Sequence, residues 1–417
     1  MRQRLKKPET SGIHLRINVQ SFEITELFPF RNKSAKQITF ISVLEFFQNG
    51  VSGDKITDVF EKICNFENLL KAYNLAKIGN RYKRAAVQFN FYLESNLFKI
   101  RQELLSGDYF PSPYKHFLVT EPKLRQISAP DFRDRVVQHS LVAVIEPLFD
   151  HTFIEDNYAC RKNKGTHFAL KRIKKFLQAS RSYYGKNVDI YILKCDIKKF
   201  FPSISWDVLL EIIKKKIICE KSFELIKKII TTHKICGQIG EQKNNQLDLF
   251  SQTIKEEPVS VTNRRGLPIG NLTSQLMANI YLNELDQYVK QVLKEKWYGR
   301  YMDDFFIISA DKEHLKNVKE EIGRFVAQKL KISLQPKKSF IQRVDLGVCF
   351  VGYRIFWDHI LIRGSTLLRF QKKFRKKIKL YKKGLLPLEK LNLCQQSFCG
   401  HLKHANAYNL KKKMFGK

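Results

Sequence analysis

The sequence predicts a mixed α+β protein in which several helices accompany a small antiparallel sheet, and three observations point to this fold class. Residues 66–107 and 367–384 repeat apolar side chains at helical spacing. Shorter apolar runs, such as residues 190–196 and 297–310, have the length and composition of strands. No internal repeat is visible across the 417 residues, which excludes solenoids and propellers.

The first third of the chain begins with a segment of unassigned role, residues 1–65, which contains Phe-rich patches but no recognisable chemistry. Residues 66–107 predict two amphipathic helices, the second ending at Gly107. Residues 114–132 alternate in polarity and predict a β-hairpin, on which Lys123 and Arg125 lie two apart and so project from one face. A helix over residues 133–149 follows, and then a basic loop that leads into another helix within residues 158–178.

The middle of the chain predicts a buried strand that ends at Asp196, because residues 190–196 form a near-continuous apolar run. Helices are expected over residues 207–235. Residues 237–265 are polar and lack periodicity, which predicts a flexible insertion. A Gly-Pro-Gly turn at residues 266–270 then opens a long helix, with capping-type side chains at Asn271, Thr273 and Ser274.

The last third predicts a hairpin, a strand pair and a basic helix. Residues 297–310 read as two apolar strands around an Asp-Asp turn, which lifts two carboxylates out of a sheet at the hairpin tip. Residues 346–356 read as a short strand pair. The helix over 367–384 has an apolar face made of Leu367, Phe370, Phe374, Ile378 and Tyr381. Residues 361–417 hold 16 Lys and Arg against one acidic residue, which favours nucleic-acid contact over a merely solvated face.

Charge and cysteine usage limit the class of protein. Lys and Arg number 75 against 40 Asp and Glu, a net charge of +35 that makes a nucleic acid the first expected partner. No stretch of 18 consecutive apolar residues occurs, so we expect a soluble, cytoplasmic protein without a membrane partner. Eight scattered cysteines suit reduced thiols. The spacing of Cys394, Cys399, His401 and His404 matches no standard zinc module, and it leaves metal binding there an open alternative.

Three aspartates stand out in this basic chain because they lie in or beside apolar strands, where charged residues are not expected. Asp196 ends one strand, and Asp303 with Asp304 separates two others. Three carboxylates brought together repel one another unless divalent cations neutralise them, and hard oxygen ligands suit Mg²⁺. Two such ions would hold a nucleophilic hydroxyl and a triphosphate for in-line phosphoryl transfer. Taken alone, an Asp-Asp pair is more often an ordinary turn.

Eight sequence blocks give the carboxylates a context, because they follow the order found in reverse transcriptases of bacterial retroelements. The blocks are EPKLRQISAP, RDRVVQHSL, YACRKNKGTH, CDIKKFFPSI, GLPIGNLTSQLMANIYLNELD, YMDD, LQPKKS and FVGYRI. The chain resembles that family over about residues 66–410. The resemblance implies a right-hand polymerase fold, with fingers at 66–180, a palm at 181–355 that includes the insertion, a basic helical thumb at 356–417 and residues 1–65 as an N-terminal extension.

The resemblance also implies roles for individual residues. Asp196, Asp303 and Asp304 would form the catalytic triad and, with the backbone carbonyl of Ile197, would bind two Mg²⁺ ions, for which Mn²⁺ could substitute. Residues expected at the incoming nucleotide are Lys123, Arg125, Phe201, Ile269, Gly270, Gln275 and Lys337. Residues expected at primer and template are Arg133, Arg135, Arg161, Lys164, Phe350, Gly352 and Tyr353.

Within these sets, Lys123 and Arg125 would grip the triphosphate, since Arg can bind phosphate in a bidentate manner. Phe201 would exclude a ribose 2′-hydroxyl and so select deoxynucleotides. Lys337 would lie near the leaving pyrophosphate, and Gly352 would allow close approach of the backbone to the primer. The competing interpretations are a solvated surface for the two cations of the hairpin and an ordinary core position for Phe201.

One block departs from the commoner family pattern, in which Gln precedes the Gly. Residues 269–275 read Ile-Gly-Asn-Leu-Thr-Ser-Gln, a form similar to the reverse transcriptases of diversity-generating retroelements, whose copying is error-prone at template adenines. The implied function is cDNA synthesis from dNTPs, a primer of DNA or RNA, and a dedicated non-coding RNA template. Antiphage-defence enzymes that copy a non-coding RNA share the framework, and the opening 65 residues keep that alternative open.

The sequence leaves two alternatives open, one about the partner of the chain and one about its catalytic activity. An accessory protein or a second copy of the chain could complete the enzyme, and the sequence does not decide between them. A catalytically silent RNA-binding scaffold is a more remote alternative, because a scaffold needs neither the three carboxylates nor the cations expected at the triphosphate.

Overall fold

The computed structural model describes residues 59–416, except for 121–122, 186 and 233–263. The chain divides into two units, Met1–Asp54 and Lys55–Lys417, and every described residue belongs to the second unit. Most of the expected N-terminal extension, residues 1–58, lies outside the described residues, as does nearly all of the expected insertion at 237–265.

Four short helices open the described chain: α2 (Val59–Cys64), α3 (Phe66–Lys77), α4 (Arg84–Phe91) and α5 (Leu93–Ser106). The first three pack against the long helix α6 (Phe132–Asp150), and α5 packs against the others. Residues 66–107 therefore form three helices instead of the two expected, because residues 78–83 and Tyr92 interrupt the helical backbone. The last of them ends at Gly107, where φ is 82°, a left-handed conformation that glycine adopts without strain.

The expected hairpin is present as β1 (Lys115–Val119) and β2 (Arg125–Ala129), paired antiparallel with Val119 opposite Arg125. All five residues of β1 are exposed. The amide of Ser128 donates to the carbonyl of Ile269 at 3.0 Å, which ties β2 to the loop ahead of α11. Lys123 precedes β2, so strand alternation does not place it on the same face as Arg125, as the sequence analysis had assumed.

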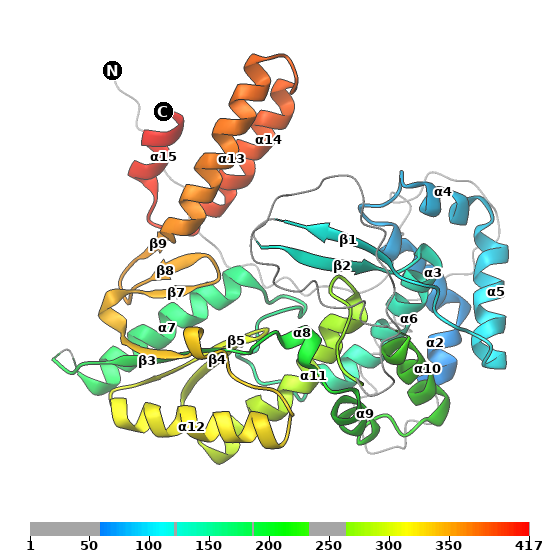
Figure 1. Ribbon diagram of the computed structural model, residues 1–417, viewed down its shortest axis with the longest axis horizontal. Coiled ribbons are helices and arrows are strands. Elements are labelled where there is room, and N and C mark those ends of the chain that lie inside the picture. Colours follow the sequence, from blue (N-terminus) through cyan, green and yellow to red (C-terminus); the bar gives the residue numbers. More distant parts are fainter. Residues whose placement is uncertain (1–58, 121–122, 186, 233–263, 417) are drawn as a thin grey trace, which may run out of the picture. The chain divides into compact units, whose positions relative to one another are not determined.

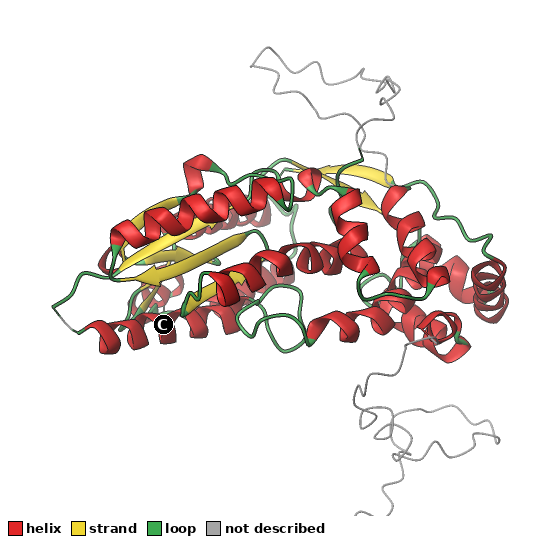
Figure 2. Cartoon of the chain, turned by 90° about the horizontal axis from the view of Figure 1, so that it is seen from below, coloured by secondary structure: helices red, strands yellow, loops and turns green. Residues whose placement is uncertain are grey.

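A four-stranded antiparallel sheet forms the centre of the unit, in the order β4–β5–β3–β6 (Figure 1). Its strands are β3 (Tyr191–Asp196), β4 (Trp297–Tyr301), β5 (Asp304–Ser309) and β6 (Phe340–Arg343). Helix α7 (Thr166–Tyr184) packs on one face and α12 (Lys312–Gln328) on the other, above and below the strands in Figure 1. Figure 2 shows helices and strands of the same chain coloured by type. Coverage of both faces explains why the two inner strands, β3 and β5, are mostly apolar.

Helices α8 (Phe200–Ser203), α9 (Trp206–Lys214) and α10 (Glu220–Thr231) follow β3. Helix α11 (Leu272–Gln287) packs against α6 and α9 and continues as a π-helical turn over Tyr288–Val292. Asn271 occupies the N-cap position of α11, as expected, but its side chain makes no capping hydrogen bond.

The C-terminal part consists of a three-stranded meander and three helices. The strands are β7 (Val348–Phe350), β8 (Tyr353–Ile355) and β9 (Ile360–Ile362), and the helices are α13 (Gly364–Lys382), α14 (Leu388–Leu402) and α15 (Tyr408–Phe415). Phe370 of α13 stacks on Phe398 of α14 with ring centroids 3.7 Å apart, within a small core of its own. This core confirms the first part of the apolar face expected for the basic helix, since Leu367 and Phe370 pack in it and Phe374 contacts Phe415, whereas Tyr381 is exposed. Within the described residues, no helix combines the length and apolar character needed to cross a bilayer.

Candidate active site

Three carboxylates meet at the end of the central sheet. Asp196 is the last residue of β3 and lies directly opposite Asp304, the first residue of β5. Asp303 occupies the β4–β5 turn, and its carbonyl accepts a hydrogen bond from the amide of Ile197 at 3.3 Å. The two apolar strands thus bring together residues that are more than 100 positions apart in the sequence.

Burial and mutual repulsion mark these carboxylates as strained in the absence of a cation. Burial raises the pKa of Asp304 to about 6, with Lys194 opposing the shift and the other two carboxylates adding to it. Burial, followed by the charge of Asp196, also raises the pKa of Asp303. One oxygen of Asp304, Oδ1, is buried without a hydrogen-bond partner. Burial and mutual repulsion therefore oppose ionisation of Asp303 and Asp304, and a divalent cation would favour it.

Three cations lie near the carboxylates, one of them on β3 itself. Lys194 Nζ of β3 is 3.0 Å from Asp304 Oδ2, and Lys338 Nζ is 2.6 Å from Asp196 Oδ2. The charge of Arg125, on β2, lowers the pKa of Asp303, which brings the β1–β2 hairpin within electrostatic reach of the site. The residues expected from the sequence included Lys337 but neither Lys194 nor Lys338. Lys337 and Lys338 are both exposed, and Lys338 is the one that reaches Asp196. Two adjacent lysines gave no signal as to which one would contact the carboxylate.

The donor set can be tested against Mg²⁺. Among the described residues, no three His, Cys, Asp or Glu side chains converge closely enough to hold a metal ion as they stand. Instead, Lys338 and Lys194 each occupy a carboxylate oxygen. The chemistry of the set nevertheless fits Mg²⁺, because it consists of hard oxygen donors, one of which is buried and unpaired.

The residues expected at the sugar and base of the nucleotide come from α8, from the loop 266–270 and from the first turn of α11. Phe201 lies in α8 and is half-buried, whereas its neighbour Phe200 is buried in the core. The carbonyl of Phe201 accepts a hydrogen bond from the amide of Leu267 at 2.9 Å, which links α8 to the loop 266–270. Ile269 and Gln275 are half-buried, and Gly270 has φ of +114°. A Cβ at Gly270 would lie 2.9 Å from Ile127 Cγ2, so this loop packs closely on β2.

Three of the four arginines and lysines expected at the template are engaged within the protein. Arg161 donates to both carboxylate oxygens of Asp150 and to the carbonyls of Ile154 and Asn157, with 8% of its side chain exposed. Lys164 pairs with Glu155 at 2.8 Å. Arg133 pairs with Glu103 across α5 and α6, and Arg135 is half-buried. The structure assigns Arg161 and Lys164 to the loop after α6, where their charges are already satisfied.

The residues expected at the primer form a tight turn between β7 and β8. Phe350 and Tyr353 are buried, with the Tyr353 hydroxyl bonded to the backbone and ring of His401. Val351 and Gly352, with φ of 42° and 93°, form the turn itself and are half-exposed. The turn therefore offers backbone atoms to a ligand, while the two aromatic side chains hold it in place.

The Cys/His cluster near the C-terminus has other contacts. His404 stacks on His167 of α7 at 3.6 Å, and His401 contacts Tyr353. Cys394 and Cys399 are half-buried free thiols in α14. Among the described residues these four side chains do not gather into a metal-binding group.

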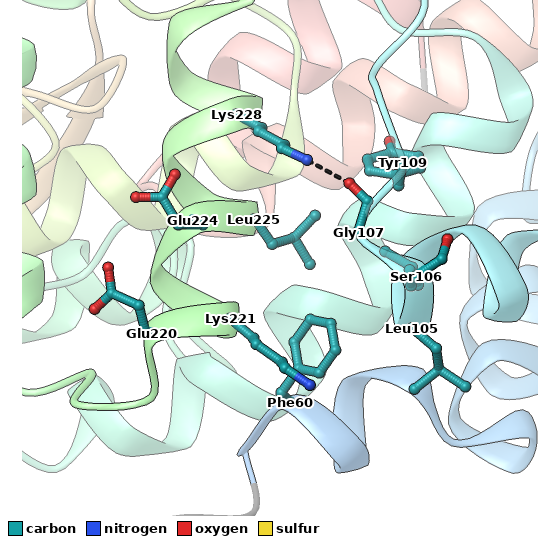
Figure 3. Close-up of a pocket in the computed structure, with 11 residues that line it drawn as sticks. Phe60, Leu105, Ser106, Gly107, Tyr109, Glu220, Lys221, Glu224, Leu225 and Lys228 are labelled. Atoms are coloured by element: carbon teal, nitrogen blue, oxygen red, sulfur yellow. Dashed lines mark hydrogen bonds between the residues drawn. The ribbon is translucent and has the colours of Figure 1, made fainter.

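A separate pocket lies between α2, α5 and α10, and Figure 3 shows the residues that line it. Phe60, Leu105 and Leu225 supply apolar lining, and Lys228 spans the opening with a 2.6 Å hydrogen bond to the carbonyl of Gly107. Glu220 and Glu224 point away from the cavity in this view. None of the three carboxylates lines the pocket, so it is distinct from the candidate active site.

The chain is similar in sequence to a known protein family and to individual proteins. Residues 115–355 match the family described as reverse transcriptase (RNA-dependent DNA polymerase). The chain is 25% identical over 290 residues to Protein YkfC of Escherichia coli, covering 61% of this chain and 70% of that protein. It is 25% identical over 362 residues to the group II intron-encoded protein LtrA of Lactococcus lactis, covering 71% of this chain and 55% of LtrA.

Among solved structures, the apo telomerase of Candida tropicalis is similar with a TM-score of 0.44 and 14% identity, over 64% of this chain and 54% of that one. The chain thus spans little more than half the length of the intron-encoded relative. The matched family range contains the whole four-stranded sheet and all three carboxylates, and with it the α+β right-hand polymerase fold that the sequence predicts is confirmed.

Proposed function

The chain belongs to the reverse transcriptase family, the RNA-dependent DNA polymerases, and on that premise we propose that it synthesises cDNA on an RNA template at Asp196, Asp303 and Asp304. The observation that carries the proposal is the register of Asp196 on β3 opposite Asp304 on β5, with Asp303 in the β4–β5 turn. The fingers, palm and thumb are proposed at residues 66–180, 181–355 and 356–417.

Each carboxylate has a proposed task in the reaction. When bound, two Mg²⁺ ions would supply the charge that activates the primer hydroxyl and stabilises the leaving pyrophosphate. Asp196 and Asp304 are proposed to hold them from opposite strands, and Asp303 from the turn. The backbone carbonyl of Ile197 is proposed as a further ligand. Lys338, now paired with Asp196, would release that carboxylate and turn to the departing phosphates.

The incoming dNTP is proposed to lie between the carboxylates and the β1–β2 hairpin. Arg125 would bind the triphosphate, supported by its electrostatic reach to Asp303. Lys123 is exposed beside it. Phe201, half-buried where its neighbour is fully buried, would contact the sugar and exclude a 2′-hydroxyl. The backbone of the Val351–Gly352 turn would support the primer end, since its flanking aromatic side chains are buried.

For the biological role, we propose mutagenic cDNA synthesis within a diversity-generating retroelement. The form Ile269-Gly270 to Ser274-Gln275 supports this proposal, because an apolar Ile269 stands where a hydrogen-bonding side chain is commoner. The carbonyl of Ile269 accepts a hydrogen bond from the amide of Ser128 in the β1–β2 hairpin, next to the proposed nucleotide site. Synthesis from a non-coding RNA in antiphage defence is the second candidate, and it predicts faithful or repetitive copying.

The test is to purify the protein with its bound RNA, supply Mg²⁺ and dNTPs, and sequence any DNA that forms. We expect DNA complementary to that RNA, and none from the variant Asp303→Ala/Asp304→Ala. Substitutions concentrated opposite template adenines would support the diversity-generating role. Equal incorporation by the double variant would refute the assignment of the carboxylates, and RNA binding without incorporation by the wild type would favour the scaffold alternative.

A further inference from the structure

A buried arginine links the carboxylate turn to the neighbouring helix. Arg300 lies on β4 with none of its side chain exposed. Its Nε and Nη2 donate to the two carboxylate oxygens of Asp286 on α11, at 2.7 and 2.6 Å. Its Nη1 donates to the carbonyl of Met302 at 3.0 Å and to Asn279 Oδ1 at 3.3 Å. One side chain thus joins α11 to the residue just before Asp303.

The same network fixes the arginine from every side. Tyr298 donates its hydroxyl hydrogen to Asp286 Oδ1 at 2.6 Å, so the acceptor is itself held in place. The amide of Arg300 donates to the carbonyl of Asp156, and the carbonyl of Arg300 accepts from the amide of Tyr158, both at 2.9 Å. The guanidinium of Arg300 is therefore held by α11, and its main chain is held by the segment that contains Asp156 and Tyr158.

The turn held by this network has an unfavourable backbone. Met302 has φ of 56°, in the left-handed region that residues other than glycine seldom adopt. Such a conformation persists only where surrounding contacts impose it. The carbonyl that Arg300 binds belongs to this same residue, so the hydrogen bond acts on the strained turn itself.

Stability alone does not account for the ion pair. Replacing a buried ion pair by apolar side chains of similar volume is often neutral or stabilising, because both charges lose their hydration on burial. What an apolar replacement cannot supply is the directed hydrogen bond from the guanidinium to the Met302 carbonyl. The contribution of Arg300 is therefore expected in the orientation of the turn more than in the free energy of unfolding.

We propose that Arg300, anchored by Asp286, is a positioning residue that holds the Met302–Asp303 turn so that Asp303 and Asp304 direct their oxygens at a divalent cation. The inference rests on the proposed function and deepens it, since it names the side chains outside the carboxylate set that determine metal affinity. If Arg300 served only to stabilise the fold, variants at this position would lose metal affinity and activity only to the extent that they unfold.

Two variants separate these roles. Arg300→Lys keeps a positive charge opposite Asp286. The lysine side chain is shorter and ends in a single ammonium group, so it cannot contact both Asp286 and the carbonyl of Met302. Arg300→Met/Asp286→Leu removes both charges together, which avoids an uncompensated buried ion and preserves folding if the single variant fails. Arg161→Lys is the matched control, because Arg161 also binds an aspartate through two atoms and two loop carbonyls, but none of these belongs to the β4–β5 turn.

Binding of Mn²⁺ would be measured by electron paramagnetic resonance, together with the melting temperature and, on a supplied primer–template, single-turnover nucleotide addition. For folded Arg300 variants we expect Mn²⁺ affinity to fall about 10-fold and the addition rate to fall roughly 100-fold, in line with a small misplacement of reacting groups, with little change in the KM for dNTP. Arg161→Lys should lower the melting temperature and leave Mn²⁺ affinity unchanged.

Wild-type Mn²⁺ affinity in a folded Arg300→Met/Asp286→Leu protein would overturn the inference, as would a loss of affinity in Arg161→Lys of the same size. The metal measurement also separates this inference from the proposed function. A wild type that adds no nucleotide, yet binds Mn²⁺ in a manner that depends on both Asp303 and Arg300, would refute the polymerase and support the positioning role.

Discussion

The two hairpins at the candidate site are held in opposite ways. The β4–β5 hairpin carries Asp303 and Asp304, and its strand β5 lies between β4 and β3 with helices covering both faces. The β1–β2 hairpin carries Arg125, forms a sheet of two strands, and exposes every residue of β1. Both hairpins have strands of about five residues, so the difference arises from what packs against them.

This contrast matches two chemical requirements. Carboxylates that bind a metal must keep a fixed geometry, and burial in a packed sheet with a charged network beneath the turn provides it. A cation that grips a triphosphate must also release pyrophosphate, which favours an element with few buried contacts and low local stability. We therefore expect substitutions in the two hairpins to affect different kinetic parameters.

The largest effect is expected from Asp304→Asn on the buried hairpin. Loss of one charged metal ligand should lower single-turnover nucleotide addition by about 10³-fold or more, as removal of a main electrostatic group in a catalytic site does. Because burial raises the pKa of Asp304 to about 6 even with Lys194 3.0 Å from one of its oxygens, the neutral amide should at the same time raise the melting temperature of the metal-free protein at pH 7. Retained activity, or a lower melting temperature, would contradict this account of the site.

A smaller and different effect is expected from Arg125→Ala on the exposed hairpin. The KM for dNTP should rise about 10-fold or more through loss of a charged contact to phosphate, with a lesser change in kcat and an unchanged melting temperature. Lys115→Ala is the matched control, because Lys115 is an exposed cation on the neighbouring strand of the same hairpin. An equal rise in KM for both variants would indicate general attraction of the nucleotide by the basic surface.

The same contrast explains what the sequence could predict. Apolar runs broken by acids predicted β3, the β4–β5 hairpin and the carboxylates at their ends, because strand periodicity is local and the acids interrupt it. Periodicity does not say which cations turn inward. Arg161 and Lys164 were assigned to the template, yet Asp150 and Glu155 satisfy them. Lys194, Lys338 and the Arg300–Asp286 pair were missed, since their roles arise from contacts between elements.

The pH dependence of stability sharpens the comparison, because the raised pKa values belong to the buried hairpin. The pKa of Asp304 rises from 3.8 to about 6 on folding, so the folded protein binds protons more tightly than the unfolded chain. The free energy of unfolding of the metal-free protein should therefore fall as pH rises from about 4 through 6.

This pH dependence would be checked by urea unfolding at pH 4.5 and pH 7 in the presence of a chelator. The free energy of unfolding of the wild type should be larger at pH 4.5 than at pH 7 by the contribution of Asp304. In Asp304→Asn this part of the difference should disappear. Saturating Mg²⁺, which binds the ionised carboxylates, should also reduce the difference between the two pH values. The same slope in the wild type and in Asp304→Asn would assign it to other groups.

The smallest effect tests the contact that joins the exposed hairpin to the rest of the unit. Gly270→Ala places a Cβ 2.9 Å from Ile127 Cγ2 on β2, at a φ of +114°. Backbone strain of this kind costs about 1–3 kcal/mol in the free energy of unfolding. Gly165→Ala is the control for backbone strain alone, because its φ is +117° and no atom lies within 4 Å of the added Cβ.

The difference between these two glycine variants then measures the steric clash with β2. Ile127→Ala in the Gly270→Ala background removes the clashing methyl group, so it should recover part of the loss, whereas Ile127→Ala alone should not stabilise the protein. If the hairpin is as weakly held as its exposure suggests, it shifts to relieve the clash, and the two glycine variants lose similar stability while only Gly270→Ala raises the KM for dNTP. A large stability loss specific to Gly270→Ala would instead show that the β1–β2 hairpin is as firmly packed as the one that carries the carboxylates.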